Sequence, residues 1–313
     1  MDSTILKSDP VVGRFAPSPT GPLHLGSLVA ALGSYLFAKH VEGRWLLRIE
    51  DIDLPRAIPG IADDMLFTLE ILGFQWDAEV IYQSRRTEIY QAALQELIDK
   101  GMAYMCGCSR AEIAATVSGP DFGDDEIPYP GLCRKGIPSG KAGRAYRVKV
   151  DDEVIDFDDR VVGLYNQVLT DCCGDFVIQR ADGPFAYHLA VVVDDAAGGI
   201  NQVVRGSDLL SSTPRQIYLQ RLIGYPTPIY AHLPLVTAPD GAKLSKRENA
   251  VSISENTDLR KTGGNLLLTA LRFLGQMPPL FLNGVPAGEL LSWAVENFKA
   301  ENIPQVSSPF FVS

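Results

Sequence analysis

The first hundred residues alternate short apolar segments with amphipathic helices, and this alternation constrains the fold more than any other feature. Residues 11–15 and 45–49 are apolar runs of the length that buried strands have. Residues 25–39 carry apolar side chains at helical spacing, and 61–72 and 86–100 are amphipathic segments that each end before a glycine. Strands that alternate with helices predict a parallel sheet with crossover helices.

The alternation breaks in the middle of the chain. Residues 106–143 are rich in glycine, proline and aspartate and show no period, so they predict an insertion outside the main sheet. Residues 145–150 and 154–157 predict strands of a small antiparallel unit. The apolar runs 176–179 and 189–193 predict strands close to the buried sheet.

The last hundred residues are mainly helical by their pattern. Residues 214–223 predict a helix that Gly224 ends, and 230–236 predict an extended strand. Two further helices are predicted over 265–274 and 287–299.

Composition excludes several classes of protein. The chain has 313 residues, of which 46% are hydrophobic and 21% charged, so there is enough apolar surface to offset the ordering entropy of folding. No apolar run reaches the ~20 residues of a membrane-spanning helix. Residues 1–10 lack the pattern of a secretory signal, so we expect a cytoplasmic protein with no membrane partner. The net charge of −10 means that RNA binding requires a local basic surface.

The turn after the first strand is the first candidate for chemistry. The chain has no G-x-x-x-x-G-K-[ST] loop, and no G-x-G-x-x-G follows this strand. The segment 17–27 instead holds three prolines that stiffen the turn, then His24, which can donate to a phosphate, and Gly26, whose missing Cβ permits close approach to the backbone. The N–H groups of the helix that begins here favour an anion. Taken alone, such a segment is more often a tight strand-to-helix turn.

Residues 243–247 are the second candidate. They place three cations within five residues on a glycine-bearing loop. Lys243 and Lys246 can neutralise the charge that develops as pyrophosphate leaves a triphosphate. A solvated basic loop is the simpler interpretation of this segment alone, but the two segments together are more specific than either.

Residues 14–26 (RFAPSPTGPLHLG) and 243–247 (KLSKR) resemble the two signatures of class I aminoacyl-tRNA synthetases, in the variant of the glutamyl branch. Segments 48–53, 187–195 and 204–210 resemble that branch too. The resemblance implies an α/β fold of the class I synthetase type. This is a Rossmann-like, doubly wound parallel sheet with a zinc-bearing insertion and a short helical C-terminal region.

The resemblance also implies a division of the chain. We expect 1–105 to be the first half of the catalytic domain, and 106–170 to be the insertion with the zinc site and the small β unit. Residues 171–253 are then the second half, with the KLSKR loop. Residues 254–313 form the short helical C-terminal region, without an anticodon-binding domain.

Chain length separates two families within the glutamyl branch. Only 67 residues follow Lys246, and an anticodon-binding domain usually needs ~100. The chain therefore resembles the truncated paralogues, the glutamyl-queuosine tRNA(Asp) synthetases. That resemblance implies a ligase that uses ATP with Mg²⁺ to convert L-glutamate to glutamyl-adenylate without tRNA. The glutamate is then attached to queuosine in the anticodon loop of tRNA(Asp). We expect a monomer.

Charge selects the residues of the amino-acid site. Arg14 and Arg205 are the candidates to pair with a side-chain carboxylate, and Glu50 is the candidate for the ammonium. Ser18 and Tyr187 add neutral hydrogen bonds, and all five are expected beyond the carboxyl ends of strands. No catalytic base is expected, because the substrate carboxylate itself attacks the α-phosphorus. The resemblance adds Phe15, Ala16 and Pro17 to the glutamate site. It assigns ATP binding to His24, Gly26 and Lys246, and catalysis to these three residues together with Lys243.

Three of the five cysteines predict a metal site. Cys106, Cys108 and Cys133 offer three thiolates, which suit zinc and leave a fourth position open. No histidine is near them in the sequence. The resemblance fills the fourth position with Tyr129, because the family's zinc pattern is Cys-x-Cys followed by Tyr-x₃-Cys. Three buried thiols without a metal are the alternative.

The other cysteines and the acidic runs are predicted to have no role in the site. Adjacent cysteines rarely ligate one metal, so Cys172 and Cys173 are predicted to be small core or surface residues. The acidic runs 121–126 and 151–159 predict solvated surface.

Three other functions compete with the favoured one. A discrete glutamyl-tRNA synthetase would charge a tRNA 3′ end, and chain length argues against it. A non-catalytic RNA-binding paralogue would have no need of His24, Gly26, Glu50 and Lys246, all of which are present. A coenzyme-forming nucleotidyltransferase would share the first signature, but the paired arginines and the zinc pattern argue against it.

Overall fold

A parallel sheet forms the centre of the molecule. The computed structural model describes residues 10–116, 127–237, 253 and 258–305. The strands of the sheet are β1 (Val12–Phe15), β2 (Arg44–Ile49), β3 (Ile81–Tyr82), β9 (Gln202–Gly206) and β10 (Ile229–Leu233). β1 pairs in parallel with β2, β2 with β3, and β9 with β10.

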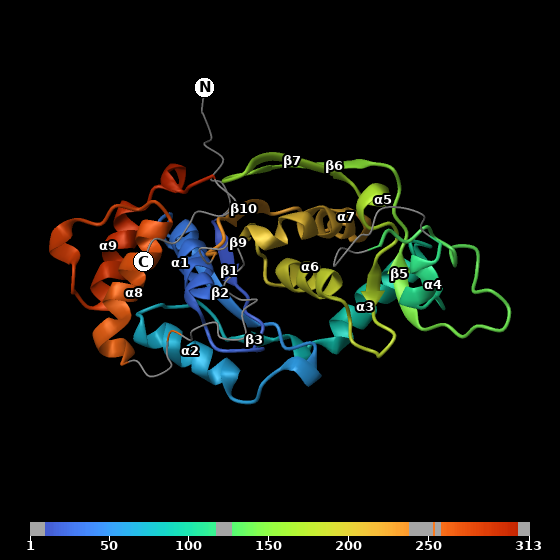
Figure 1. The fold of residues 1–313 in the computed structure, drawn as a ribbon, viewed down its shortest axis with the longest axis horizontal. Helices are drawn as coiled ribbons and strands as arrows, with labels where there is room; N and C mark the ends of the chain where they lie inside the picture. Colours follow the sequence, from blue (N-terminus) through green and yellow to red (C-terminus); the bar gives the residue numbers. More distant parts are fainter. Residues whose placement is uncertain (1–9, 117–126, 238–252, 254–257, 306–313) are drawn as a thin grey trace, which may run out of the picture.

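The two halves of the sheet meet between β1 and β9. The Asn201 N–H donates to the Val12 carbonyl oxygen at 3.1 Å, and the Val12 N–H donates to Asn201 Oδ1 at 2.8 Å. The strands therefore follow the order β3, β2, β1, β9, β10 across the molecule (Figure 1). The chain winds in opposite directions from β1 and from β9, as predicted for a doubly wound sheet.

Helices cover both faces of the sheet. One face carries α1 (Leu25–Lys39), α2 (Ile61–Ile71), α8 (Leu259–Phe273) and α9 (Ala287–Asn297), and the other carries α3 (Thr87–Asp99), α6 (Tyr187–Ala197) and α7 (Thr213–Ile223). Alternate residues of β2 belong to different cores: Trp45 and Leu47 pack with the first group of helices, and Leu46 packs with the second. This arrangement confirms the α/β fold class.

Helix α1 packs on the sheet with Gly33 facing β10. A Cβ at Gly33 would stand 2.4 Å from Leu233 Cδ1, so a larger residue would force the Leu233 side chain to move. Short 3-10 helices span Leu54–Arg56, Gln83–Arg85, Ser207–Ser212, Leu280–Leu282 and Ala300–Asn302. In the described part of the chain, no helix is long and apolar enough to cross a membrane.

A second group of strands lies outside the main sheet. β4 (Ala103–Cys106), β5 (Ala145–Val148) and β8 (Val177–Gln179) form an antiparallel sheet, and β6 (Val154–Asp159) pairs with β7 (Gly163–Val168) as a hairpin. The short helices α4 (Arg110–Ala114) and α5 (Leu169–Cys172) flank them. The two strands predicted as one unit therefore belong to different sheets. The predicted strand 176–179 pairs with β5, away from the main sheet.

The predictions for residues 189–193 and for Asp159 are wrong, in both cases because tertiary packing overrides the local pattern. Residues 189–193 form the middle of helix α6 where a strand was predicted, and each of them is buried. Periodicity cannot distinguish a strand from a helix that is buried all round. Asp159 was predicted to be solvated but is only 2% exposed, because the hairpin places it under β10. Tertiary packing decides both cases.

Candidate active site

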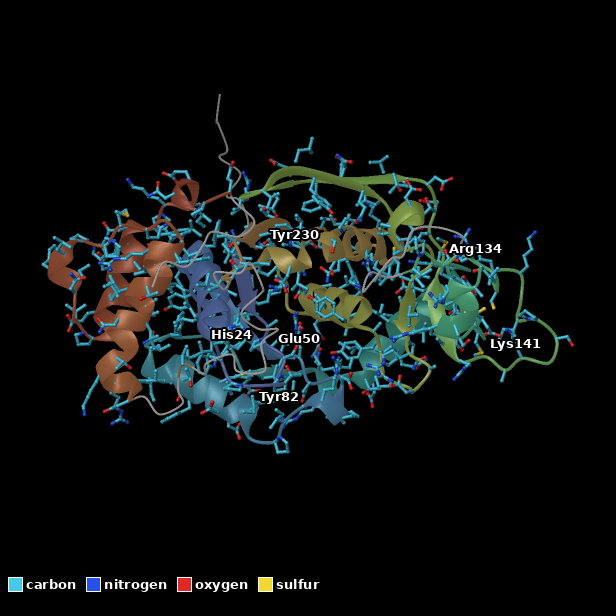
Figure 2. The ribbon with its side chains drawn as sticks, viewed as in Figure 1. His24, Glu50, Tyr82, Arg134, Lys141 and Tyr230 are labelled. Carbon is cyan, nitrogen blue, oxygen red and sulfur yellow. The ribbon has the colours of Figure 1, made fainter. Side chains whose placement is uncertain are left out.

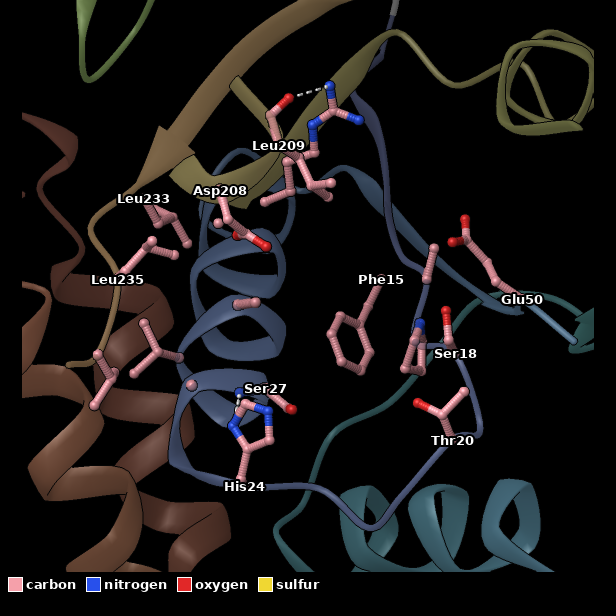
Figure 3. Close-up of a pocket in the computed structure, with 18 of the residues that line it drawn as sticks. Phe15, Ser18, Thr20, His24, Ser27, Glu50, Asp208, Leu209, Leu233 and Leu235 are labelled. Carbon is pink, nitrogen blue, oxygen red and sulfur yellow. Dashed lines mark hydrogen bonds between the residues drawn. The ribbon is translucent and has the colours of Figure 1, made fainter. Parts of the chain in front are cut away.

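A pocket of about 780 Å³ opens where β1, β2, β9 and β10 end (Figure 3). β1 and β9 are the strands between which the winding reverses, and ligands of doubly wound sheets bind at such points. Ten predicted residues line the pocket: Arg14, Phe15, Ala16, Pro17, Ser18, His24, Gly26, Glu50, Tyr187 and Arg205. Lys243 and Lys246 lie outside the described residues.

His24 caps helix α1 at one side of this pocket. Its Nδ1 accepts a hydrogen bond from the Ser27 N–H at 3.2 Å (Figure 3), so the neutral ring carries its proton on Nε2. A Cβ at Gly26 would stand 3.0 Å from His24 Cε1, so glycine makes room for the ring. The helix end was predicted to offer its N–H groups to an anion. The Ser27 N–H is not available to one while this cap is in place.

A cluster of buried charged side chains lies beside the pocket: Arg14, Arg48, Glu50 and Asp195. Arg48 Nη1 donates to Asp195 Oδ1 at 2.6 Å, and its Nη2 donates to Glu50 Oε1 at 3.1 Å. Arg14 Nε donates to both Asp195 oxygens, at 3.3 and 3.4 Å. The Glu50 N–H donates to the Pro17 carbonyl oxygen at 2.9 Å, which ties the end of β2 to the loop after β1.

The carboxyl groups of this cluster have shifted pKa values. Burial raises the pKa of Glu50, although Arg48 and Arg14 act in the opposite direction. Burial also acts to raise the pKa of Asp195, but Arg14 and Arg48 more than offset it and the pKa is lowered. Asp195 is therefore a fixed counter-ion, whereas Glu50 is the carboxyl group that remains beside the pocket.

Arg205 reaches the pocket from β9. Its Nη1 donates to the Tyr187 hydroxyl at 3.3 Å, and its Nη2 donates to the Leu209 carbonyl oxygen at 3.4 Å (Figure 3). Tyr187 is the first residue of α6 and so comes from a helix end, not from a strand end as predicted. Burial raises the pKa of its phenol, so the hydroxyl remains protonated.

The two buried carboxylates of α6, Asp194 and Asp195, were not predicted from the sequence. Asp194, beside Asp195 in α6, accepts hydrogen bonds from the Tyr90 hydroxyl at 2.8 Å and from Arg86 Nε at 2.7 Å. Two carboxylates directly after an apolar run were the available signal, because a buried carboxylate needs a cationic partner. Arg56 and Asp208 also line the pocket without having been predicted.

The predicted metal ligands lie together at one end of the molecule. The sulfur atoms of Cys106, Cys108 and Cys133 are all within 4.8 Å of one another. The Tyr129 hydroxyl lies 3.3 Å from Cys106 Sγ and 3.5 Å from Cys108 Sγ. Tetrahedral zinc with Zn–S bonds of about 2.3 Å separates its sulfur ligands by roughly 3.8 Å, so this donor set fits zinc.

The cysteine cluster is remote from the pocket. His24 and Glu50 lie near the middle of the molecule, whereas Arg134 and Lys141 mark the insertion at its end (Figure 2). Cys173 is buried in the second core and Cys172 is half-buried, in line with the prediction for these two residues.

Residues 10–279 match the family described as tRNA synthetases class I (E and Q), catalytic domain. A relative from Geobacter sulfurreducens, named glutamyl-Q tRNA(Asp) synthetase, is 60% identical over 304 residues, which is 97% of each chain. A relative of the same name from Dechloromonas aromatica is 52% identical over 300 residues, 96% of this chain and 98% of that one.

Solved structures agree with these relatives. A glutamate tRNA ligase from Elizabethkingia meningosepticum, in complex with its amino acid, is similar with a TM-score of 0.77 and 28% identity. The similarity covers 95% of this chain and 66% of that one. A glutamate-tRNA synthetase from Elizabethkingia anophelis gives a TM-score of 0.78 at 27% identity, over 97% of this chain and 68% of that one. The predicted resemblance is thus confirmed, and the chain belongs to the glutamyl-Q tRNA(Asp) synthetase family of class I aminoacyl-tRNA synthetases.

Proposed function

We propose that this protein activates L-glutamate with ATP, without tRNA, and transfers the glutamate to the queuosine base in the anticodon loop of tRNA(Asp). One observation carries the proposal. The pocket at the reversal point of the sheet combines two arginines and a carboxyl group, in a chain 60% identical to a relative of that name. Such a pocket complements an amino acid with a second carboxylate.

Glutamate binds between the ends of three strands. Arg14 and Arg205 pair with its carboxylates, and Glu50 accepts from its ammonium group. Ser18 and Tyr187 supply neutral hydrogen bonds, and the backbone of Phe15, Ala16 and Pro17 forms the wall beside them. All eight residues line one pocket, which supports this assignment.

The first reaction needs no protein base. An α-carboxylate oxygen of glutamate attacks the α-phosphorus of ATP, the bond to the β-phosphate oxygen breaks, and pyrophosphate leaves with that electron pair. The product is glutamyl-adenylate. The protein aligns the two substrates and stabilises the developing charge. Mg²⁺ enters with ATP and neutralises part of the phosphate charge.

The phosphates lie on the side of the pocket formed by His24 and Gly26. His24 donates from Nε2, the nitrogen that its capping bond leaves protonated. Lys243 and Lys246 supply the positive charge needed as pyrophosphate departs. We also propose that the enzyme acts as a monomer.

Transfer is the second reaction. A hydroxyl oxygen of the queuosine base attacks the acyl carbon of the adenylate, and the bond from that carbon to the phosphate oxygen breaks. AMP leaves with the electron pair, the hydroxyl proton is released to solvent, and an ester remains. The anticodon loop therefore enters the pocket where a 3′-charging relative would place the acceptor end. A chain with a net charge of −10 must do this through a local basic surface, with strong salt dependence.

Two assays test this function. ATP–pyrophosphate exchange with each amino acid should show activity with glutamate alone, before any tRNA is added. An anticodon stem-loop bearing queuosine should then accept labelled glutamate, and the same stem-loop with guanine should not. Exchange that requires tRNA, or transfer that requires the 3′ end, would instead favour an ordinary glutamyl-tRNA synthetase.

We also propose one structural zinc ion per chain, held by Cys106, Cys108, Tyr129 and Cys133. The closeness of the four donor groups supports this. Zinc would supply local folding energy and takes no part in the reaction. Metal analysis should give about one zinc per chain, and none after Cys106→Ser combined with Cys133→Ser. Zinc retained by the double variant would refute the site.

A further inference from the structure

The two pocket arginines are held in different ways. Arg14 forms a buried ion pair with Asp195. Arg205 is only 5% exposed, yet no carboxylate among the described residues lies within ion-pair distance of it. Neutral acceptors hold it instead: its Nε donates to His232 Nε2 at 3.1 Å, and its Nη2 donates to Thr213 Oγ1 at 2.8 Å. A buried charge without a counter-ion is costly until a ligand supplies one.

The neighbours of His232 determine its tautomer. The Arg205 Nε–H can only donate, so His232 Nε2 must accept. The other ring nitrogen, Nδ1, lies 2.6 Å from Asp159 Oδ2 and donates its proton there, and both side chains are fully buried. Burial lowers the pKa of His232, against the opposing effect of Asp159, so the ring is neutral at pH 7. A protonated ring would place a second donor and a second positive charge against Arg205.

Asp159 is itself held rigidly by backbone groups. It ends strand β6, in the hairpin that runs beside β10 (Figure 1). Its Oδ1 accepts from the backbone N–H groups of Val161, Val162 and His232, each at 3.0 Å. The next residue, Arg160, donates its N–H to the carbonyl oxygen of Tyr230 in β10 at 2.9 Å. The hairpin outside the main sheet is thus connected to the pocket through one carboxylate.

We propose that His232 and Asp159 are positioning residues for substrate recognition, which hold Arg205 through a neutral imidazole so that its charge remains available to a carboxylate of the substrate. A carboxylate in direct contact with Arg205 would fix the side chain equally well but would neutralise it. The imidazole transmits the orientation without bringing the negative charge into contact. This inference rests on the proposed activation of glutamate.

Three substitutions separate the two contacts of His232. In His232→Asn the shorter amide still reaches Asp159 but no longer reaches Arg205, so the KM for glutamate should rise about tenfold or more in pyrophosphate exchange. In His232→Gln the side-chain oxygen can still accept from Arg205, so the rise should be smaller. In Asp159→Asn the amide donates to His232 Nδ1 and moves the ring proton to Nε2, against Arg205. This nearly isosteric change should raise the KM for glutamate at least as much as His232→Asn.

Control measurements distinguish positioning from folding. The KM for ATP should stay constant in all three variants, and His40→Asn, at an exposed histidine, should change neither KM. In the wild-type protein at pH 7, ¹⁵N NMR should show His232 protonated on Nδ1 alone, a result that needs no variant to fold.

Three results would contradict the proposed role of His232 and Asp159. A ring protonated on Nε2 would overturn the proposal, as would a KM for ATP that rises in parallel with that for glutamate. An unchanged KM for glutamate in Asp159→Asn would do the same. If the wild-type protein does not activate glutamate, the proposed function fails first.

Discussion

The pocket and the cysteine cluster are stabilised by different interactions. The apolar side chains that line the pocket belong to a large core, and its buried arginines are held by carboxylates and neutral acceptors of the chain itself. The cysteine cluster has a core of only four buried residues: Cys106, Ile113, Tyr129 and Cys133. Three of these are predicted zinc ligands. A region with little apolar surface needs another source of folding energy, and a structural metal is one.

The comparison predicts its largest effect in the buried charges beside the pocket. Replacing Asp195 by Ala leaves Arg14 and Arg48 buried without their shared partner. Removing one member of a buried ion pair costs roughly 3–5 kcal/mol, so the free energy of unfolding should fall by about that amount. Chemical denaturation would measure it. Asp182→Ala, which breaks an exposed pair with Arg180, should cost less than about 1 kcal/mol.

A small effect of Asp195→Ala would contradict the comparison. It would mean that the sheet cores alone hold the pocket, with the charges serving only the substrate. The zinc content of this variant should stay the same, because Asp195 pairs with Arg14 and Arg48 of the main sheet and not with the cysteine cluster.

The sequence predicted the pocket better than the residues that support it. Arg14, Glu50 and Arg205 were found because they follow or end apolar strands, where ligands of parallel sheets bind. Their partners come from segments whose structure depends on distant contacts. Asp195 was out of reach because its segment was predicted as a strand, and Asp159 because an acidic run normally lies on the surface.

The secondary structure shows the same difference between local pattern and distant contacts. Helix α1 was predicted over its full length because its apolar spacing is local information. The predicted pairing of 145–150 with 154–157 was wrong, because β5 pairs with β4 and β8 through contacts far apart in the sequence, and β6 pairs with β7. Local pattern predicts amphipathic elements, whereas tertiary packing determines their partners and the conformation of fully buried segments such as 189–193.

The second effect concerns Arg205. Arg205→Ala removes a charged hydrogen bond to the substrate, which should weaken glutamate binding by roughly 1.5–3 kcal/mol. The KM for glutamate in pyrophosphate exchange measures this loss, and the KM for ATP should not change. Arg221→Ala is a matched control, because that arginine is exposed and pairs with Glu153. Unchanged affinity for glutamate would remove Arg205 from the site.

The third effect tests the cysteine cluster with a single oxygen atom. Tyr129→Phe keeps the ring over which Arg147 lies, with its guanidinium carbon 4.1 Å from the ring centre, and removes only the hydroxyl. Zinc affinity should fall by about tenfold, equivalent to about 1.4 kcal/mol. Competition with a chelator would measure it. Full affinity in the variant would mean that water or another group is the fourth ligand, and the pocket should keep its glutamate KM in either case.

The smallest effect concerns the pH dependence of glutamate binding. Burial raises the pKa of Glu50, so the fraction of its ionised form begins to fall at a higher pH than for an ordinary carboxyl group. Only the ionised form attracts the substrate ammonium, and binding must therefore weaken as the pH falls. The substrate's own charges are constant between pH 6 and 8. One group can change the KM by at most about tenfold per pH unit. We expect the rise in the KM for glutamate from pH 8 to pH 6 to stay well below that limit, because Arg48 and Arg14 oppose the effect of burial on Glu50. Glu50→Gln should raise the KM at every pH and make the profile flat, since the amide does not titrate. A profile that keeps its slope in Glu50→Gln would assign the titration to another group and would remove Glu50 as the ammonium partner.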